Sequence, residues 1–190
     1  NVDNSYQPNC RWYTGSGIYR HVWLTSTNPI YFKQWGTFIT TPNVSEDKAD
    51  VAISTEIINS YDNERELSLT TILYGPLGDE IGRTTKGIVI KPGETLKINQ
   101  LLPVQKPQCW SPDSPSLYSA RLSVAENNRE IDSILESFGI RTISYSAEEG
   151  FKLNGNSLLL NGGCIHHDNG PLGAAAFDRA EIRKVQLMKE

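Results

Sequence analysis

Apolar and polar residues alternate with a period of two through much of residues 23–141. Val51, Ile53 and Ile57 occupy every second position of one such stretch, and residues 67–73 repeat the pattern. A period of two places successive side chains on opposite faces of a strand, so one face is buried and the other is wet. Helical periodicity is absent from this region, which therefore predicts a fold that is mainly β.

Turn residues separate the candidate strands at intervals of roughly 8 to 12 residues, which is the spacing of a β-sandwich. The candidates are residues 30–39, 51–58, 67–73, 80–90, 96–102, 118–124 and 131–143. Pro92 and Gly93 provide the turn after the fourth of them. Strands of this number and spacing predict an immunoglobulin-like β-sandwich. We interpret its polar residues as a solvated outer face and assign no catalytic residue to it.

The pattern changes after Tyr145. Asn154 and Gly155 separate two short apolar runs, and this dipeptide tolerates the positive φ angles of a two-residue turn, so we predict a β-hairpin. Residues 162–165 are consistent with a buried strand, and Asp178 and Glu181 form a capping pattern that predicts a helix with Ile182, Val185 and Met188 on one face. Strand, loop and helix in this order make one β/α unit, which normally continues into further units.

Composition excludes several classes of protein. The formal charge of −4 comes without a cluster of Lys or Arg, so a nucleic-acid partner is not expected. No apolar run approaches the length of about 18 residues that a membrane span requires, and the polar start does not resemble a signal peptide. The three cysteines are scattered and lack C-x-x-C spacing, so we predict no disulfide framework, no metal site and no cofactor.

Four stretches in order resemble one family, the glycoside hydrolases of family 2, which include bacterial β-galactosidases and β-glucuronidases. Residues 15–24 (GSGIYRHVWL) resemble the end of the family's sugar-binding-like jelly roll, and residues 110–118 (WSPDSPSLY) resemble a stretch late in its sandwich. Residues 138–141 (FGIR) resemble the end of that sandwich, and residues 151–190 resemble the start of a (β/α)8 barrel.

The resemblance implies a domain organisation and an activity. Residues 1–26 would end the jelly roll, residues 27–145 would form the sandwich, and residues 146–190 would hold the first strand and helix of a truncated barrel. The parent enzyme would hydrolyse a β-linked glycoside by the retaining route. Within the family, residues 163–175 look most like β-galactosidase-type members. Glycoside hydrolysis needs two carboxylates about 5 to 10 Å apart. By resemblance these glutamates lie beyond Glu190, so the chain by itself is expected to be inactive.

The motif residues also have physical roles that do not depend on the family. Two prolines among residues 110–118 stiffen the chain, and Trp110 and Tyr118 can bury large rings while a polar atom still reaches a partner. We expect core packing there in preference to stacking on a sugar. Arg20 is expected either in an ion pair between domains or as an exposed side chain.

His166, His167 and Asp168 lie where the first barrel strand would end, which is where barrel active sites form. By resemblance, His166 matches the family histidine that hydrogen-bonds the sugar beside the scissile bond. An imidazole can donate to or accept from a hydroxyl without a fixed charge. Asp168 and Asn169 are expected to orient His166 or to contact the substrate. A loop histidine bonded to backbone is the alternative, and adjacent residues on a strand end seldom chelate one metal.

Two other functions stay open at this point. A stand-alone immunoglobulin-like binding or adhesion module would suit the sandwich but leaves the start of the barrel unexplained. The second function is an independent small enzyme or metalloprotein built on His166, His167 and Asp168. The partners expected for the whole protein are a carbohydrate and the flanking jelly roll and barrel. A homo-oligomer, and a periplasmic or cytoplasmic location in a bacterium, are left open by the sequence.

Overall fold

The computed structural model describes residues 3, 5–6, 17–167 and 169–190. The chain divides into two compact units. One comprises Ser26–Leu159, and the other combines Leu160–Glu190 with the N-terminal residues as far as Thr25. The predicted motif residues Gly15 and Ser16, and Cys10, lie outside the described residues. The larger unit is built from strands, and the smaller unit contains the α-helix.

The first sheet of the larger unit is organised around β3 (Lys48–Asn59). β6 (Thr95–Gln105) pairs with one side of β3 along almost its whole length. On the other side, β1 (Ile30–Phe32) and β2 (Phe38–Val44) follow one another along the same edge of β3. Every pairing is antiparallel. Because β1, β2 and β6 each pair with β3, this strand joins the whole sheet.

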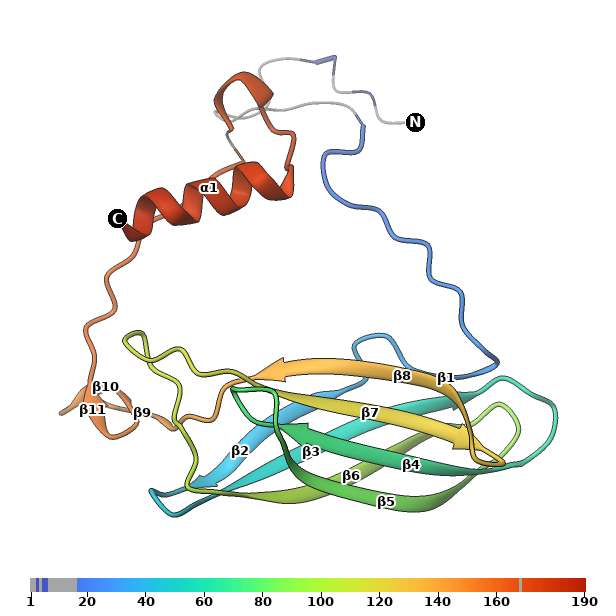
Figure 1. Ribbon diagram of the computed structural model, residues 1–190. Helices are drawn as coiled ribbons and strands as arrows, with labels where there is room; N and C mark the ends of the chain where they lie inside the picture. Colours follow the sequence, from blue (N-terminus) through green and yellow to red (C-terminus); the bar gives the residue numbers. More distant parts are fainter. Residues whose placement is uncertain (1–2, 4, 7–16, 168) are drawn as a thin grey trace. The chain divides into compact units, whose positions relative to one another are not determined.

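The second sheet has the order β5-β4-β7-β8, and its neighbours are also antiparallel. It consists of β5 (Glu80–Ile90), β4 (Arg65–Tyr74), β7 (Tyr118–Glu126) and β8 (Arg129–Phe138). The chain changes sheet between β3 and β4, between β5 and β6, and between β6 and β7, which Figure 1 shows. This two-sheet arrangement confirms the predicted mainly β fold as a β-sandwich.

Apolar side chains from both sheets form one continuous core. β3 supplies Val51, Ile53 and Ile57, each at most 1% exposed, and the intervening side chains of the strand are partly exposed. This confirms the alternation predicted for residues 51–58. The second sheet supplies Leu69, Leu73, Leu122 and Val124, all fully buried. Burying such a side chain contributes about 1.5 to 3 kcal/mol, so the core is the main source of stability.

Two of the predicted strands are each divided in the structure. Residues 30–39 form β1 and β2 with a break at Trp35, whose φ is 56°, and at Gly36. A Cβ on Gly36 would lie 2.9 Å from the Lys33 carbonyl oxygen, so the tight turn requires glycine there. The strand predicted over residues 131–143 ends at Phe138. Apolar residues lie on both sides of each break, so the apolar pattern alone does not show where the strand ends.

The break after β8 is caused by close packing against Trp110. A Cβ on Gly139 would lie 2.9 Å from Trp110 Cβ, and the Trp110 amide donates to the Ile140 carbonyl over 2.8 Å. Tyr118 is 3% exposed, and its hydroxyl accepts a 2.8 Å hydrogen bond from the Gln108 amide. Tyr118 therefore packs in the core, as the sequence predicts, whereas Trp110 is half-buried and packs against Gly139.

A small three-stranded sheet follows the sandwich within the larger unit. It contains β9 (Ile143–Ser146), β10 (Gly150–Leu153) and β11 (Asn156–Ser157). The predicted two-residue turn is confirmed, because Asn154 and Gly155 have φ values of 51° and 77°. The returning strand ends at Ser157, earlier than predicted. Asn127 and Asn128, with φ of 51° and 63°, form a second turn of this kind that the sequence reasoning missed.

The smaller unit contains the predicted helix but not the predicted strand. The helix α1 (Asp178–Lys189) begins at the predicted position and follows a short 3-10 turn, η1 (Gly170–Leu172). Residues 162–165 form no strand, and Ile165 is 59% exposed. A barrel strand is stabilised by hydrogen bonds to neighbouring strands, and none of the described strands pairs with this segment. The start of a barrel therefore stays a prediction.

The predicted capping pattern of this helix is wrong in detail. The N-cap residue is Phe177, which makes no side-chain capping bond. Asp178 and Glu181 lie inside the first turn, where their negative charges still favour the positive end of the helix dipole. In the described part of the chain, no helix is both long and apolar enough to cross a membrane.

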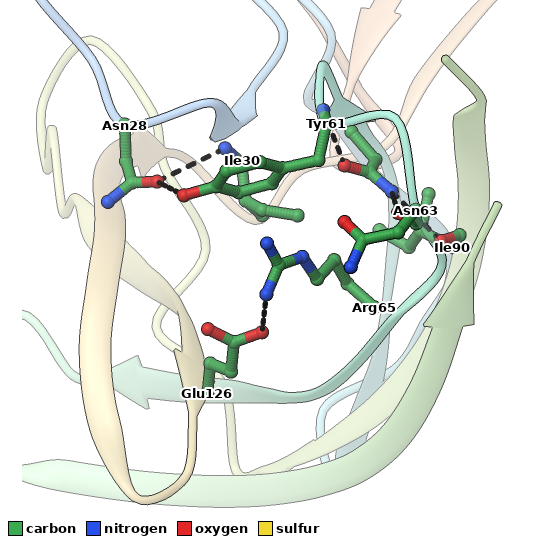
Figure 2. A network of polar contacts seen from close by, with 8 residues as sticks. Asn28, Ile30, Tyr61, Asn63, Arg65, Ile90 and Glu126 are labelled. Carbon is green, nitrogen blue, oxygen red and sulfur yellow. Dashed lines mark hydrogen bonds and ion pairs between the residues drawn. The ribbon is translucent and has the colours of Figure 1, made fainter. Parts of the chain in front are cut away.

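Asn59 organises a polar network at one end of the sandwich, which Figure 2 shows from close by. Its side chain is fully buried, and Nδ2 donates to the carbonyls of Asn63, Ile90 and Lys91 at 3.0 to 3.1 Å. Oδ1 accepts from the Tyr61 amide over 2.9 Å. One amide thus ties the end of β3 to the loop before β4 and to the end of β5.

Arg65 extends this network across the second sheet. Its guanidinium carbon lies 3.9 Å from the centre of the Tyr61 ring, and Nη1 is 3.2 Å from Glu126 Oε1 (Figure 2). The Tyr61 hydroxyl donates to Asn28 Oδ1 over 3.5 Å, and the same oxygen accepts from the Ile30 amide over 3.4 Å. The segment that leads into β1 is therefore joined to this network.

We predict that Asn59→Ala lowers the free energy of unfolding by about 2 to 3 kcal/mol, because it leaves buried carbonyl groups without their donor. The matched control is Asn99→Ala, which removes an exposed asparagine side chain from β6 and should change stability by less than about 0.5 kcal/mol. Urea denaturation of both variants measures the difference. Equal stability of the two variants would contradict the structural role of Asn59.

Candidate functional site

The predicted substrate-binding residues belong to the smaller unit. His166 is exposed, and its carbonyl oxygen accepts a long hydrogen bond of 3.5 Å from Lys184 Nζ on α1. Asp168 lies outside the described residues. Asn169 is half-buried and makes several hydrogen bonds within the unit. The role of His166 and Asp168 toward a substrate therefore stays a prediction.

His167 makes the most specific contacts of this loop. Arg20 Nη2 lies 3.1 Å from His167 Nδ1 and also contacts Nε2. The ring of Tyr19 lies 5.5 Å from the imidazole, centre to centre, at an interplanar angle of 56°. A guanidinium carries donors only, so its bond to an imidazole nitrogen requires that nitrogen to offer a lone pair. One ring nitrogen of His167 is therefore the acceptor of the Arg20 contact.

Two further contacts join the same N-terminal segment to the region around α1. The Ala176 amide donates to the Tyr19 carbonyl over 2.9 Å. His21 Nε2 lies 2.7 Å from Asp178 Oδ1 in the first turn of the helix. The two side chains are 53% and 75% exposed, so this pair contributes little to stability by itself. The contact instead joins the first turn of α1 to the N-terminal segment.

Asn169 and Glu181 connect the loop after His167 to the helix. Asn169 Nδ2 donates to Glu181 Oε1 over 2.8 Å and to the Ala175 carbonyl over 3.0 Å. Lys184 Nζ lies 2.9 Å from the other oxygen of Glu181. The hydrogen bond from Asn169, followed by that from Lys184, holds the pKa of Glu181 below its ordinary value of 4.5. The carboxylate is therefore an acceptor that organises the loop.

A hollow of about 370 Å³ lies among these groups. We call it the His167 hollow. Its lining consists of Arg20, His21, His167, Ala176, Asp178 and Glu181. Both hydrogen-bond donors and hydrogen-bond acceptors line it, which suits a ligand rich in hydroxyl groups. Among the described residues, no three His, Cys, Asp or Glu side chains lie close enough together to hold a metal ion.

Sequence reasoning singled out His166, His167 and Asp168, assigned the sugar contacts to His166 and Asp168, and did not place His21 or Asp178 at a site. His167, His21 and Asp178 lie on the hollow, whereas His166 does not contribute to its lining. Arg20 is exposed and contacts His167 within the smaller unit, and the ion pair between domains expected for it stays a prediction. The available signal was the polar pair Arg20 and His21 at the end of the GSGIYRH stretch.

A second hollow, of about 490 Å³, lies on the sandwich. Trp110 and Arg141 line it, and the Arg141 guanidinium lies 5.2 Å from the centre of the Trp110 ring. Thr41 donates to the Arg141 carbonyl over 3.1 Å at its edge. Cys109 lies elsewhere on this unit, and partial burial raises the pKa of its thiol. A thiol with a raised pKa is a weak nucleophile at neutral pH, so Cys109 does not indicate a catalytic centre.

Comparison with known proteins identifies the family. A family model described as "Glycosyl hydrolases family 2" matches residues 34–141, which is more than half of the chain of 190 residues. The chain belongs to glycosyl hydrolases family 2. The resemblance on which the sequence reasoning rested is therefore confirmed, and the match covers most of the sandwich.

Curated family 2 relatives match the whole length of this chain. A β-galactosidase of Bacteroides ovatus, BoGH2A, is 41% identical over 189 residues, which are 100% of this chain and 22% of that protein. A putative β-glucuronidase of Formosa agariphila is 34% identical over 190 residues, which are 100% of this chain and 18% of that protein. The chain thus spans about a fifth of the length of the curated relatives that it matches.

Solved structures of family 2 proteins match as well. A family 2 member from Bacteroides cellulosilyticus has a TM-score of 0.90 at 46% identity and covers 95% of this chain and 25% of its own. A β-glucuronidase of Bacteroides uniformis has a TM-score of 0.84 at 35% identity and covers 91% of this chain and 22% of its own. These likenesses agree with a β-sandwich domain of a larger glycosidase.

The Asn169 contact predicts how Glu181 titrates. Because the folded-state pKa of Glu181 is lowered, its interaction stabilises the unit above about pH 4.5 and is lost as the pH falls through the folded-state pKa. We expect Asn169→Ala to raise the pKa of Glu181 toward 4.5, and Lys184→Ala to raise it in the same direction. Carbon-13 NMR titration of the side-chain carboxyl groups measures both variants.

Glu130 provides an internal control for this titration, because Arg121 holds the pKa of Glu130 below its ordinary value in the larger unit. Its titration should be the same in wild type and in both variants. An unchanged titration of Glu181 in Asn169→Ala would show that the amide does not stabilise the carboxylate.

Proposed function

We propose that this chain is the accessory β-sandwich domain, with parts of its neighbours, of a family 2 glycosidase that hydrolyses β-galactosides. One observation supports a β-galactoside as the substrate: the whole chain matches a β-galactosidase of Bacteroides ovatus at 41% identity. In the whole protein, residues 1–26 end a jelly roll, residues 27–145 form the sandwich, and residues 146–190 begin the barrel. The sandwich acts as a spacer that orients the jelly roll against the barrel.

The electrostatics of the carboxyl groups support an accessory role. The general acid of a glycosidase needs a raised pKa. Among the described residues, every carboxyl group with a resolved shift has its pKa lowered, in each case chiefly by a hydrogen bond from a neighbouring side chain. These groups are Asp50, Glu56, Glu80, Glu130 and Glu181. A carboxylate stabilised in this way is a poor proton donor at neutral pH, so the acid–base pair is expected in another part of the whole protein.

The smaller unit supports a contribution to substrate binding. His166 and Asp168 are the proposed contacts to the sugar in the whole protein, and the neighbouring His167 hollow offers an arginine, two imidazoles and two carboxylates. Such groups form directional hydrogen bonds to sugar hydroxyls without any cofactor. The proposed substrate is therefore held partly by this unit, while the bond-breaking groups come from elsewhere in the barrel.

A β-glucuronidase is the second candidate, because the structure of such an enzyme from Bacteroides uniformis matches with a TM-score of 0.84 at 35% identity. The two candidates differ by one carboxylate on the substrate, which a β-glucuronidase must neutralise or hydrogen-bond. Arg20 is the cation that lines the His167 hollow. A guanidinium can pair with the carboxylate of a glucuronide. A strong preference of the whole protein for glucuronides would favour this second candidate.

A panel of chromogenic β-galactosides, β-glucuronides and β-mannosides tests the proposal. We expect the whole protein to hydrolyse the β-galactoside with the highest kcat/KM and the chain of 190 residues to hydrolyse none of them. Turnover by the 190-residue chain would overturn the accessory role. Turnover of another glycoside alone by the whole protein would retain the accessory role and replace the substrate.

His166→Ala in the whole protein tests the proposed sugar contact. Loss of one hydrogen bond to a sugar hydroxyl should raise KM by about fivefold to tenfold, because such a bond contributes about 1 kcal/mol. Gln186→Ala, which removes an exposed side chain of α1, is the matched control and should leave KM unchanged. Steady-state kinetics on the preferred glycoside measure both, and an unchanged KM in His166→Ala would remove His166 from the site.

A further inference from the structure

Three consecutive residues before the sandwich contact a region that follows it in the sequence. The Tyr19 carbonyl accepts from the Ala176 amide, Arg20 contacts His167, and His21 contacts Asp178. The side-chain contacts join residues that are 147 and 157 positions apart. All of them lie within the smaller unit. The N-terminal segment is thus part of the structure around the His166 loop, which we define as the described residues 166, 167 and 169.

We propose that Arg20 is a positioning residue for the His166 loop: its guanidinium holds the imidazole of His167 and thereby sets the place of the neighbouring proposed sugar contact, His166. This inference rests on the proposed function, because it concerns the substrate affinity of the same site. Arg20 itself is not proposed to touch the reacting atoms. It acts through His167, which lies between His166 and Asp168 in the sequence.

The geometry of the contact supports a holding role. Arg20 Nη2 is 3.1 Å from Nδ1 of His167 and also contacts Nε2, so the guanidinium faces the nitrogen side of the ring. The Tyr19 ring packs near both groups, 5.5 Å from the imidazole and 5.4 Å from the guanidinium carbon. An arginine that stacks on an aromatic ring loses little further freedom when it donates a hydrogen bond. The imidazole is therefore held by a side chain that is itself oriented.

The rest of the loop is held from the helix. Lys184 Nζ donates to the His166 carbonyl over 3.5 Å, and Glu181 accepts from Asn169 over 2.8 Å. The first of these bonds holds the backbone at His166, and the second holds the side chain of Asn169, which also donates to the Ala175 carbonyl. Arg20 adds a contact to His167 from a different part of the chain. A loop that must be ordered when a ligand binds costs conformational entropy, and this cost appears as weaker affinity.

The neighbouring contacts of the N-terminal segment do not replace Arg20. The pair of His21 and Asp178 directs the helix and leaves the loop untouched, and both side chains are more than half exposed. The Ala176 amide bonds the backbone of Tyr19, so it places the segment regardless of the side chain at position 20. Arg20 thus donates a hydrogen bond from this segment to the His166 loop, while the Tyr19 ring packs beside the same imidazole.

Kinetics of the whole protein provide the first test. In Arg20→Ala we expect KM for the preferred glycoside to rise by about tenfold while kcat changes by less than about twofold, because the loop is argued to bind and not to transfer protons. Arg20→Lys keeps a charged donor but not the planar fork, so its KM should lie between those of wild type and Arg20→Ala. Arg179→Ala removes an exposed arginine of α1 and is the matched control.

Amide hydrogen exchange provides a second readout that does not depend on activity. Peptides that contain residues 166–169 should exchange about tenfold faster in Arg20→Ala than in wild type, whereas Arg179→Ala should leave the rate unchanged. Exchange in the sandwich core around Ile53 and Leu122 should stay slow in both variants, which shows that the protein remains folded. An unchanged exchange rate of residues 166–169 in Arg20→Ala overturns the positioning role.

The two readouts separate this inference from the proposed function. If the wild-type protein hydrolyses no glycoside of the panel, the proposed function fails, and the exchange rate still decides whether Arg20 holds the loop. If the wild type is active and Arg20→Ala keeps its KM, the role in substrate affinity is wrong even where the loop exchanges faster. A rise of KM together with faster exchange, and partial rescue by Arg20→Lys, supports the inference.

Discussion

The larger unit depends on the burial of one face of each sheet against the other. β3 pairs with three strands and presents Val51, Ile53 and Ile57 to the core, while β4 and β7 present Leu69 and Leu122 from the opposite sheet. Because this apolar burial is non-directional, it brings the sheets together without fixing their ends. The Asn59 network fixes one end with directional bonds, since one buried amide joins the end of β3 to carbonyls of the loop before β4 and of the end of β5.

The smaller unit is held together in a different way. Its helix has no buried residue, and the contacts that define it are polar: Arg20 with His167, His21 with Asp178, and Asn169 with Glu181. Exposed polar contacts contribute little stability each, but they impose geometry. A region that is organised by hydrogen-bonding groups around a hollow is suited to a polar ligand, whereas the sandwich is suited to support.

Strands and turns could be predicted from the sequence where one short window contains the whole signal. The alternation in β3, the Asn154-Gly155 turn and the start of α1 are examples. The break at Gly139 could not be predicted, because it depends on the distant residue Trp110 lying close to that glycine. The break at Gly36 is a local turn with Lys33 that the sequence reasoning did not recognise. The strand expected at residues 162–165 is wrong in the structure, since a strand also needs a partner. For the site, the sequence indicated the loop but chose His166, and the residues of the His167 hollow emerged only from contacts.

The sequence by itself determined the class of fold, the turn chemistry and the membership of family 2, because periodicity, φ preference and ordered motifs are all carried by local residue identity. Tertiary structure decided which strands pair, which glycines break them and which side chain reaches His167. Those outcomes depend on groups that are far apart along the chain, such as the 147 positions between Arg20 and His167. No local preference specifies such a partner, since the bond forms only after the backbone has brought the two residues together.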